Sequence, residues 1–205
     1  MSGKGGNNSA GTDGETGLPG FIRLETERMI LRDHRSADLL SHHALFSDDI
    51  AMRYLRDIQT HSIKESDVNL QFAMQEIGSP DRAHVFLRME DKQTGGHIGE
   101  IGYTVSAFTP LGKLADLGYF TYPRIWNKGY TTEAVKAILS YAFTLDGVVR
   151  MSVGCLTENT GSERVMQKCG FIKEAEFKQL VWHEGSLKDR VVYRLLTNEW
   201  LNQMS

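Results

Sequence analysis

Apolar and polar residues alternate in several short runs of the chain, and this period of two is typical of strands that bury one face of a sheet. Residues 21–32 read FIRLETERMILR and predict a strand or a hairpin that turns around Glu25 to Arg28. The other predicted strands are residues 84–89, 97–106, 115–122, 149–156, 171–180 and 190–196.

Apolar residues recur at spacings of three and four in residues 131–145, which predict the clearest helix of the chain. Its apolar stripe consists of Ala134, Val135, Ile138, Leu139, Ala142 and Leu145. Two helices are predicted before it, at residues 36–45 and 63–77, and a short one after it, at 162–169. This order of elements predicts an α/β fold with one central sheet and no internal repeat.

The composition agrees with one globular domain and a tail. The chain has 205 residues, of which 40% are hydrophobic, and this is enough apolar material for a sizeable core. Residues 1–18 contain almost no large apolar side chains, so we expect a disordered tail there. Residues 19–205 are then the single folded domain.

The charge balance excludes some classes of partner. The 26 acidic residues slightly outnumber the 23 basic ones, for a formal net charge of -3, and this gives no sign of a nucleic-acid-binding domain. No stretch reaches the roughly 18 apolar residues of a membrane span, and the N-terminus lacks the apolar run of a secretory signal. We therefore expect a cytoplasmic protein that binds neither nucleic acid nor membranes.

No metal site is predicted, because Cys155 and Cys169 stand without a nearby pair of histidines that would complete a tetrahedral ligand set. Both cysteines are expected to be reduced and packed as small apolar side chains. His42 and His43 are adjacent, so on a helix they would point in different directions. We interpret these two histidines as surface or boundary residues.

The segment from Tyr119 to Ala134 joins the end of a strand, a polar turn with Gly129 and the start of the strongest helix. A helix N-terminus exposes unpaired N–H groups and a partial positive charge, so it binds phosphate when it faces a pocket. An ordinary strand–turn–helix connection has the same spacing, and both interpretations stand at this point. The motifs G-x-x-x-x-G-K-[ST] and G-x-G-x-x-G are absent, which argues against nucleotide triphosphate hydrolysis and a Rossmann site.

A second polar cluster occupies residues 159–171. Asn159 ends a predicted strand, and Ser162 and Met166 share one face of the short helix that follows. Gly170 suits the left-handed conformation that ends many helices. Taken alone, this pattern also fits a capped helix with a C-terminal glycine.

Together, the two clusters resemble the GNAT superfamily of N-acetyltransferases. The acetyl-CoA signature of that family, Gln/Arg-x-x-Gly-x-Gly/Ala, falls on Trp126-x-x-Gly129-x-Thr131 and differs from it at both ends. The Trp, the Gly-Tyr pair and the following Thr-Glu-Ala look like the branch that contains the ribosomal-protein N-terminal acetyltransferases. Residues 26–32 (TERMILR) are similar to the Thr-Glu-Arg-Leu-x-Leu-Arg that opens that branch. Its Asn-x-x-Ser and Lys-x-Gly-Phe are matched by Asn159, Ser162, Lys168, Gly170 and Phe171.

The resemblance implies a mixed, mostly antiparallel sheet with helices on both faces, splayed into a V between residues 115–122 and 149–156. Acetyl-CoA, the acetyl donor, would lie in that gap. Its pantetheine arm would bind backbone groups of Phe120 and Tyr122, and Asn159 would contact the arm or the substrate. Its pyrophosphate would lie on the turn formed by Trp126, Asn127, Lys128, Gly129, Tyr130, Thr131 and Thr132.

The implied reaction is direct transfer of the acetyl group from the thioester to a primary amine in a ternary complex. Glu100 and Asp116 are the candidates for the base that removes the amine proton. Many family members protonate the departing thiolate with a Tyr at the position of Met166, so Ser162 or water is the candidate donor here. A catalytically silent module that binds or senses acetyl-CoA is the alternative function.

The acceptor stays open between a protein N-terminal amine and a small-molecule amine. Its groove is expected between the two N-terminal helices and the loop before Arg190. The candidate lining residues are Tyr54, His61, Trp182 and His183. Both a monomer and a homodimer are compatible with the sequence.

Overall fold

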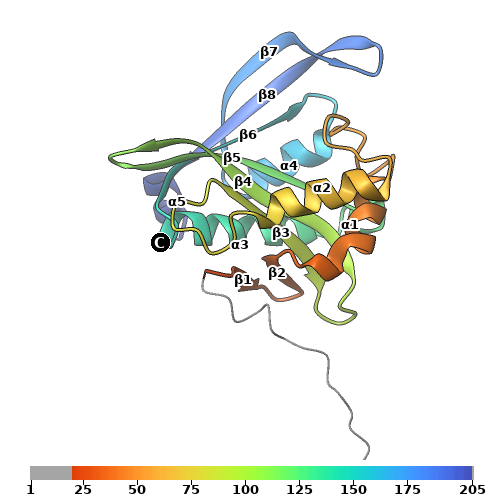
Figure 1. The fold of residues 1–205 in the computed structure, drawn as a ribbon. Coiled ribbons are helices and arrows are strands. Elements are labelled where there is room, and N and C mark those ends of the chain that lie inside the picture. The colour runs from red at the N-terminus through yellow and green to blue at the C-terminus, as the bar shows by residue number, and fades with distance from the viewer. Residues whose placement is uncertain (1–19, 205) are drawn as a thin grey trace, which may run out of the picture.

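One eight-stranded sheet runs through the part of the chain that the structure describes, residues 20–204 of a computed structural model (Figure 1). The predicted disordered tail, residues 1–18, lies outside these described residues. The strands are β1 (Arg23–Glu25), β2 (Met29–Asp33), β3 (His84–Asp91), β4 (His97–Thr109), β5 (Gly112–Thr121), β6 (Val148–Leu156), β7 (Ile172–His183) and β8 (Ser186–Leu196). The helices are η1 (Ser36–Asp38), α1 (Leu39–Phe46), α2 (Ile63–Met74), η2 (Pro123–Ile125), α3 (Tyr130–Thr144), α4 (Thr160–Lys168) and α5 (Thr197–Met204).

The strands lie in the order β1-β2-β3-β4-β5-β6-β8-β7. All neighbouring pairs are antiparallel except β5 and β6, which run parallel. These two strands pair only as far as Asp116 and Ser152, although β5 continues to Thr121 and β6 to Leu156. They separate over the rest of their length, which confirms the predicted mixed α/β fold with a V-shaped opening in its sheet.

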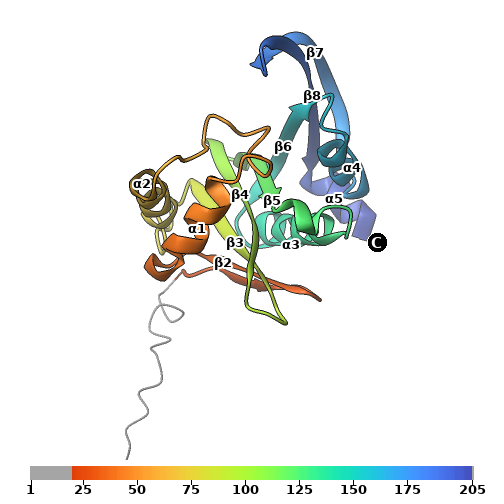
Figure 2. The same cartoon turned by 90° about the vertical axis from the view of Figure 1, so that its right-hand side faces the viewer.

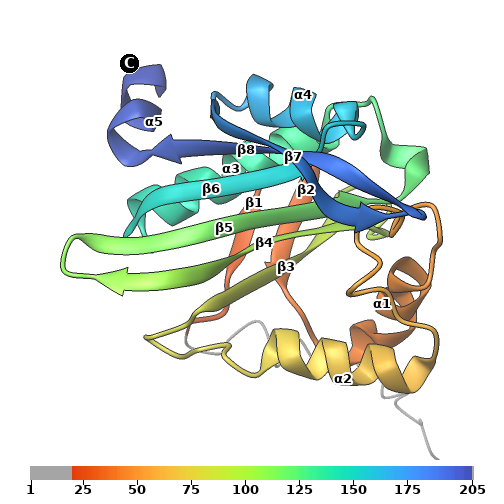
Figure 3. The ribbon, with the colours of Figure 1, turned by 90° about the horizontal axis from the view of Figure 1, so that it is seen from above.

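Helices cover both faces of the sheet. α1 and α2 lie on one face, while α3 and α4 lie on the other (Figures 2 and 3). The apolar stripe of α3 is buried as predicted, since Ala134 to Ala142 along that stripe are at most 1% exposed. Leu145 is the exception, because it caps the end of the helix and is 76% exposed. Within residues 20–204, no helix has the length and apolar composition needed to cross a bilayer.

The β7–β8 hairpin is longer than its sequence pattern predicts. The pattern indicates strands at 171–180 and 190–196, whereas pairing continues to His183 and Ser186 at the tip. Most β7 residues are exposed, so cross-strand pairing within the hairpin stabilises its outer part. Because neither face of this part is buried, its sequence shows no alternation of apolar and polar residues. The hairpin projects beyond the body of the sheet toward the connection between α1 and α2 (Figure 3).

Candidate active site

The opening between β5 and β6 leaves one edge of β5 unpaired among the described strands from Leu117 to Thr121. The Tyr122 N–H donates to the Ile98 carbonyl of β4 at 3.1 Å, and Phe120 lies opposite Glu100 in the same ladder. Backbone groups of alternate residues point to the same side of a strand, so Phe120 and Tyr122 face β4. The backbone groups of Tyr119 and Thr121 therefore face the gap, one residue away from the positions that the resemblance implied.

The turn from Trp126 to Thr132 closes one end of the gap. Asn127 and Gly129 both adopt left-handed φ angles, of 58° and 80°, and Gly129 directly precedes α3 at its N-cap position without capping it through a side chain. The first amides of α3, from Tyr130 to Thr132, have no intrahelical acceptor, and the helix dipole adds a partial positive charge there. Trp126, Asn127 and Lys128 are exposed around this end. The predicted turn thus has the geometry of an anion site.

Arg28, in the β1–β2 turn, fastens this loop to the sheet. Its backbone N–H donates to Glu133 Oε1 at 2.9 Å and its Nε to Glu133 Oε2 at 2.7 Å. Its Nη1 donates to the Lys128 carbonyl at 2.9 Å, and its guanidinium lies 4.1 Å from the centre of the Tyr130 ring. Burial raises the pKa of Glu133, but hydrogen bonds from Thr26 and Arg28 outweigh it and lower the pKa. This contact gives Arg28, the first arginine of the TERMILR motif, a structural role at the loop before α3.

Asn159, Ser162 and Tyr119 meet on the other side of the gap. The Asn159 side chain caps α4 by accepting from the Ser162 N–H at 3.2 Å. The Tyr119 hydroxyl lies 3.0 Å from Ser162 Oγ and 3.2 Å from the Ser162 carbonyl. Burial raises the pKa of Tyr119, more than the bond to Ser162 lowers it. Met166 is fully buried in the core, so the two hydroxyls, and not position 166, supply exchangeable protons here.

Both cysteines are free and buried, as predicted. Burial raises the pKa of Cys155 to about 11 and that of Cys169 to about 12. Cys155 Sγ lies 3.7 Å from the Asn159 carbonyl, close to the opening but as a neutral thiol.

The two candidate bases differ in access. Asp116 is exposed and stands where β5 and β6 separate. Glu100 is only 6% exposed and is enclosed by histidines: His34 Nε2 at 3.0 Å, His97 Nε2 at 3.0 Å and His42 Nδ1 at 3.5 Å. Burial raises the pKa of Glu100, but the charges of His34 and His97 hold it well below its usual value. His42 is 1% exposed, so its interpretation as a surface or boundary residue is wrong.

Two of the four predicted acceptor residues come together at the tip of the β7–β8 hairpin. The Tyr54 ring stacks on His183 with their centres 5.5 Å apart. Arg53 donates two hydrogen bonds, of 3.0 and 2.8 Å, to Glu184. Trp182 is 70% exposed, and His61 is also exposed. The α1–α2 connection thus touches the hairpin through Arg53 and Tyr54.

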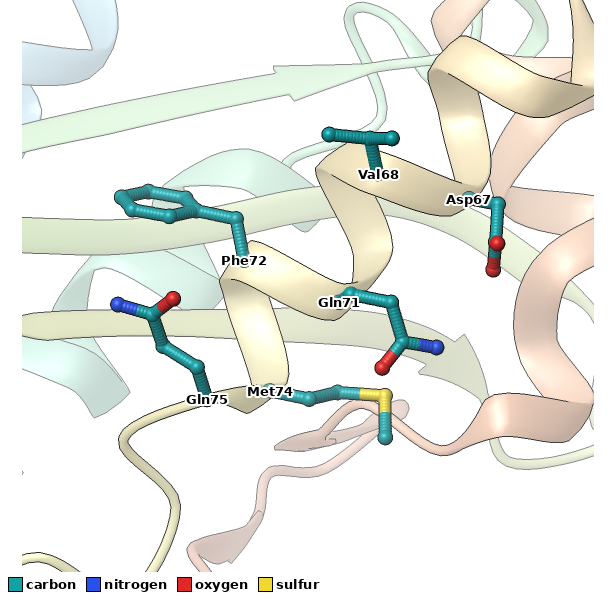
Figure 4. A pocket seen from close by; sticks show the side chains of 6 residues that line it. All are labelled: Asp67, Val68, Gln71, Phe72, Met74 and Gln75. Carbon is teal, nitrogen blue, oxygen red and sulfur yellow. The ribbon is translucent and has the colours of Figure 1, made fainter.

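A hollow on the outer surface of α2 lies apart from all these groups. Figure 4 shows its lining, which comes from one helix and its end: Asp67, Val68, Gln71, Phe72, Met74 and Gln75. None of the predicted site residues contributes to it.

Comparison with known proteins identifies this arrangement. The acetyltransferase (GNAT) domain family matches residues 28–172. The chain is 30% identical to the uncharacterized N-acetyltransferase YoaA of Bacillus subtilis (strain 168), over 86% of this chain and 97% of that protein.

Two solved structures show how far the fold is shared. The ribosomal-protein-S5-alanine acetyltransferase of Vibrio fischeri matches with a TM-score of 0.75 and 19% identity, over 87% of this chain and 98% of that one. The spermidine N-acetyltransferase of Vibrio cholerae, in complex with CoA and spermine, matches with a TM-score of 0.73 and 22% identity, over 85% and 99%. The chain therefore belongs to the GNAT acetyltransferase family, and it is an acyltransferase that takes an acetyl group from acetyl-CoA for transfer to an amine.

Proposed function

We propose that this enzyme acetylates the primary amine of a protein N-terminus or of a small molecule by direct attack on acetyl-CoA in a ternary complex. The observation that carries the proposal is the unpaired edge of β5, which leads to the N-terminus of α3 behind Gly129. Together they offer backbone groups for an amide-containing arm and N–H groups for a phosphate. Relatives of similar fold are named for a protein N-terminal substrate and for spermidine, which supports both kinds of acceptor.

In this proposal, the pyrophosphate of acetyl-CoA binds the amides at the start of α3, and Lys128 adds positive charge at the exposed rim. The pantetheine arm pairs with backbone groups of Tyr119 and Thr121. The Thr121 carbonyl already accepts from the Trp126 indole at 3.1 Å, so the arm competes with, or displaces, that contact. Asn159 lies across the gap, where its capping role positions Ser162.

The acetyl transfer itself requires three functions from the chain. The amine nitrogen attacks the thioester carbonyl, whose oxygen becomes an oxyanion stabilised by a gap-facing N–H of β5. The C–S bond then breaks, and the thiolate takes the hydroxyl proton of Ser162 while Ser162 takes that of Tyr119 from 3.0 Å away. Solvent water then returns a proton to Tyr119. This pair supplies the proton that a tyrosine at the position of Met166 would otherwise give.

Asp116 is the proposed acceptor of the amine proton, directly or through one water. Its exposure at the point where β5 and β6 separate allows contact with an incoming amine, and a carboxylate positioned in this way is suited to general base catalysis. Glu100 lies behind its histidines and would influence an acceptor only through them.

An assay of free CoA thiol release tests this function. The enzyme is incubated with acetyl-CoA and each amine of a panel. The panel should hold peptides with different N-terminal residues, polyamines and amino acids, with Nα-acetylated peptides as a control for the amine. We expect thiol release in proportion to acetylated product for one acceptor class. Measurable acetyl-CoA binding without thiol release for any amine would favour the catalytically silent module.

A further inference from the structure

Four ionisable side chains from three parts of the chain meet inside the molecule, between α1 and the sheet. His34 follows β2, His42 belongs to α1, and His97 and Glu100 belong to β4. Their exposed fractions are 2%, 1%, 6% and 6% respectively. A buried charge is costly unless it is paired or bound to a metal, so this cluster requires a compensating charge.

Glu100 differs from the other buried acids in its partners. Asp33 is paired with Arg82 at 2.7 Å, and Asp38 with Arg32 at 2.8 Å. Glu100 faces only histidines, which carry a charge only when protonated. At Glu100, the compensating positive charge must come from protonated histidine or from a bound cation.

The hydrogen bonds of His97 and His42 show where that source would lie. His97 Nδ1 and Nε2 face the Ser41 and Gly99 carbonyls at 3.1 and 3.0 Å, and both nitrogens can donate only when the ring is protonated, so His97 is a donor that places one positive charge beside Glu100. His42 Nε2 lies 2.8 Å from Asn69 Oδ1 and donates to it. In that tautomer the lone pair of His42 Nδ1 points toward Glu100 Oε1 at 3.5 Å, so two acceptors face each other.

Several polar atoms of the cluster consequently have no hydrogen-bond partner within residues 20–204: His34 Nδ1, His42 Nδ1 and Glu100 Oε1. Buried polar atoms without partners are rare, and an ion that binds His42 Nδ1 and Glu100 Oε1 is one physical explanation. His34 would bind that ion through Nε2, which lies 3.0 Å from Glu100 Oε2. His34, His42 and Glu100 each offer a ligand atom within 4.8 Å of the others. Zn²⁺ binds imidazole and carboxylate ligands at about 2.0–2.2 Å, so only a small contraction is needed.

We propose that His34, His42 and Glu100 bind a divalent transition-metal ion, for which Zn²⁺ is the best match. Two neutral imidazoles and a carboxylate form the His₂Glu set that zinc accepts, with a fourth position for water. Asn69 orients His42, and His97 orients Glu100, in the manner of outer-sphere partners that fix metal ligands. No local sequence pattern indicates this site, because its residues are far apart in the chain.

The position of the ion indicates a structural role. The His42 ring stacks on Phe46 at 4.1 Å, and Phe46 contacts Phe120 at 5.1 Å between ring centres. Phe46 therefore connects the cluster to Phe120 of β5, the strand proposed to bind the coenzyme. The ion would fasten α1 to β2 and β4 and so fix the floor of the acceptor side, independently of acetyl transfer.

A second group of possible ligands, Glu158, His183 and Glu184, is a weaker candidate. Its carboxylates already have cationic partners, Lys188 at 2.8 Å and Arg53 at 2.8 Å. Both carboxylates are also exposed to solvent. In the metal-binding experiment, this second group serves as a comparison for the His34, His42 and Glu100 cluster.

The test uses the full chain, freed of metal by a chelator and titrated with Zn²⁺ or Co²⁺ alone. We expect one equivalent per chain by elemental analysis and visible d–d bands from bound Co²⁺. At 100 times its Kd, Zn²⁺ should raise Tm by roughly 5–10 °C. His42→Gln and His34→Gln should abolish binding, while His43→Gln, the adjacent position on the same helix, should retain it.

Circular dichroism separates lost binding from lost folding in the variants, and the wild-type Co²⁺ spectrum needs no variant. Absence of Co²⁺ bands and of any Tm change in the wild-type chain overturns the proposal, and protons then balance the cluster. Equal metal binding by His42→Gln and the wild type also overturns it. If His183→Gln loses metal binding and His42→Gln keeps it, the ion belongs to the second group, and this result also overturns the proposal.

Discussion

The two sides of the β5–β6 gap are built in different ways. The proposed donor side consists of the β5 edge, the Trp126–Thr132 turn and the start of α3, which are consecutive in the chain and rest on the buried part of the α3 stripe. The acceptor side joins two distant segments, the α1–α2 connection and the tip of the β7–β8 hairpin. Its visible links are the exposed Arg53–Glu184 ion pair and the Tyr54–His183 stack.

This difference suggests a division of labour within one enzyme. The proposed donor site, made of backbone amides and a helix dipole, would bind the anionic end of the coenzyme in the same way whatever amine is present. An acceptor site made of exposed side chains on a hairpin can change its contacts with few consequences for the core. Changes on the donor side should therefore affect every acceptor equally, and changes on the acceptor side should affect some amines more than others.

The largest effect is expected from Gly129→Glu. A carboxylate at this position would repel the pyrophosphate and remove its close approach to the helix, and two lost charge-assisted hydrogen bonds correspond to about 100-fold or more in kcat/KM for acetyl-CoA. Steady-state kinetics with two unlike amines should show the same loss for both. Gly95→Glu is the matched control, since Gly95 also has a positive φ, of 67°, and an added Cβ there meets no described atom within 4 Å. A loss that differs between the amines would contradict the division between the two sides.

A smaller loss is expected from Ser162→Ala, because the thiolate would then leave without its proton donor. General acid catalysis contributes about 100-fold or more in many enzymes, but a thiolate is a tolerable leaving group, so kcat should fall about tenfold while KM for acetyl-CoA is unchanged. Tyr119→Phe should lower kcat less, since Ser162 keeps its own proton.

Thr160→Ala, at the exposed start of the same helix, is the control for α4 itself. Pre-steady-state measurement of thiol release separates the chemical step from product release. Unchanged kcat in both Ser162→Ala and Tyr119→Phe would remove the hydroxyl pair from the mechanism and leave water as the proton source.

The difference between the donor side and the acceptor side also explains how much of the site could be predicted from the sequence. The donor turn was predicted because its signals are local: a strand end, a glycine and a strong amphipathic stripe within sixteen residues. The resemblance implied Phe120 and Tyr122 for the pantetheine arm, whereas the backbone groups of Tyr119 and Thr121 face the gap. This shift of one residue has a physical cause. Alternation along a strand assigns side chains to faces, but which neighbour each backbone group faces depends on the pairing with β4.

The acceptor side and the histidine cluster could not be predicted from local pattern. Adjacent His42 and His43 look alike in sequence, yet His42 is buried against Glu100 while His43 contacts Ser66 through Nδ1 at 2.8 Å. The β7 strand is polar on most of its length, so its extension to His183 follows from pairing with β8 alone. The contacts of His42 with Glu100 and of Tyr54 with His183 join residues more than fifty positions apart. The pairing of β7 with β8 is local, but the polar residues of β7 do not indicate it.

On the acceptor side, Arg53→Ala should change selectivity and leave the donor site intact. Without Arg53, Glu184 loses its bidentate partner and the α1–α2 connection is released from the hairpin, so KM for the acceptor should rise several-fold, to different extents for a peptide and for a polyamine. KM for acetyl-CoA should stay constant. Lys178→Ala removes the ion pairs of an exposed β7 lysine with Glu176 and Asp189, and it serves as the control. An equal rise in KM for acetyl-CoA would show that the two sides are coupled.

The smallest effect concerns the stability of the donor side and its pH dependence. The folded pKa of Glu133 lies below its ordinary value of 4.5, so its ion pair with Arg28 contributes stability that is fully present above that value. This contribution disappears as the pH falls through the lowered pKa, because the carboxylate is then protonated. The pair is partly exposed, with 37% and 18% of the two side chains accessible, so the contribution is at most about 1 kcal/mol.

Urea unfolding of the wild type and of Glu133→Gln at pH 7 and pH 3 measures the contribution of the Arg28–Glu133 ion pair to stability. The difference in unfolding free energy should be present at pH 7 and shrink at pH 3, while KM for acetyl-CoA rises only slightly at pH 7. A large KM increase with no change in stability would mean that Glu133 acts on the coenzyme through the loop. The rigidity of the donor turn would then depend on Arg28 and Glu133 more than on the buried face of α3.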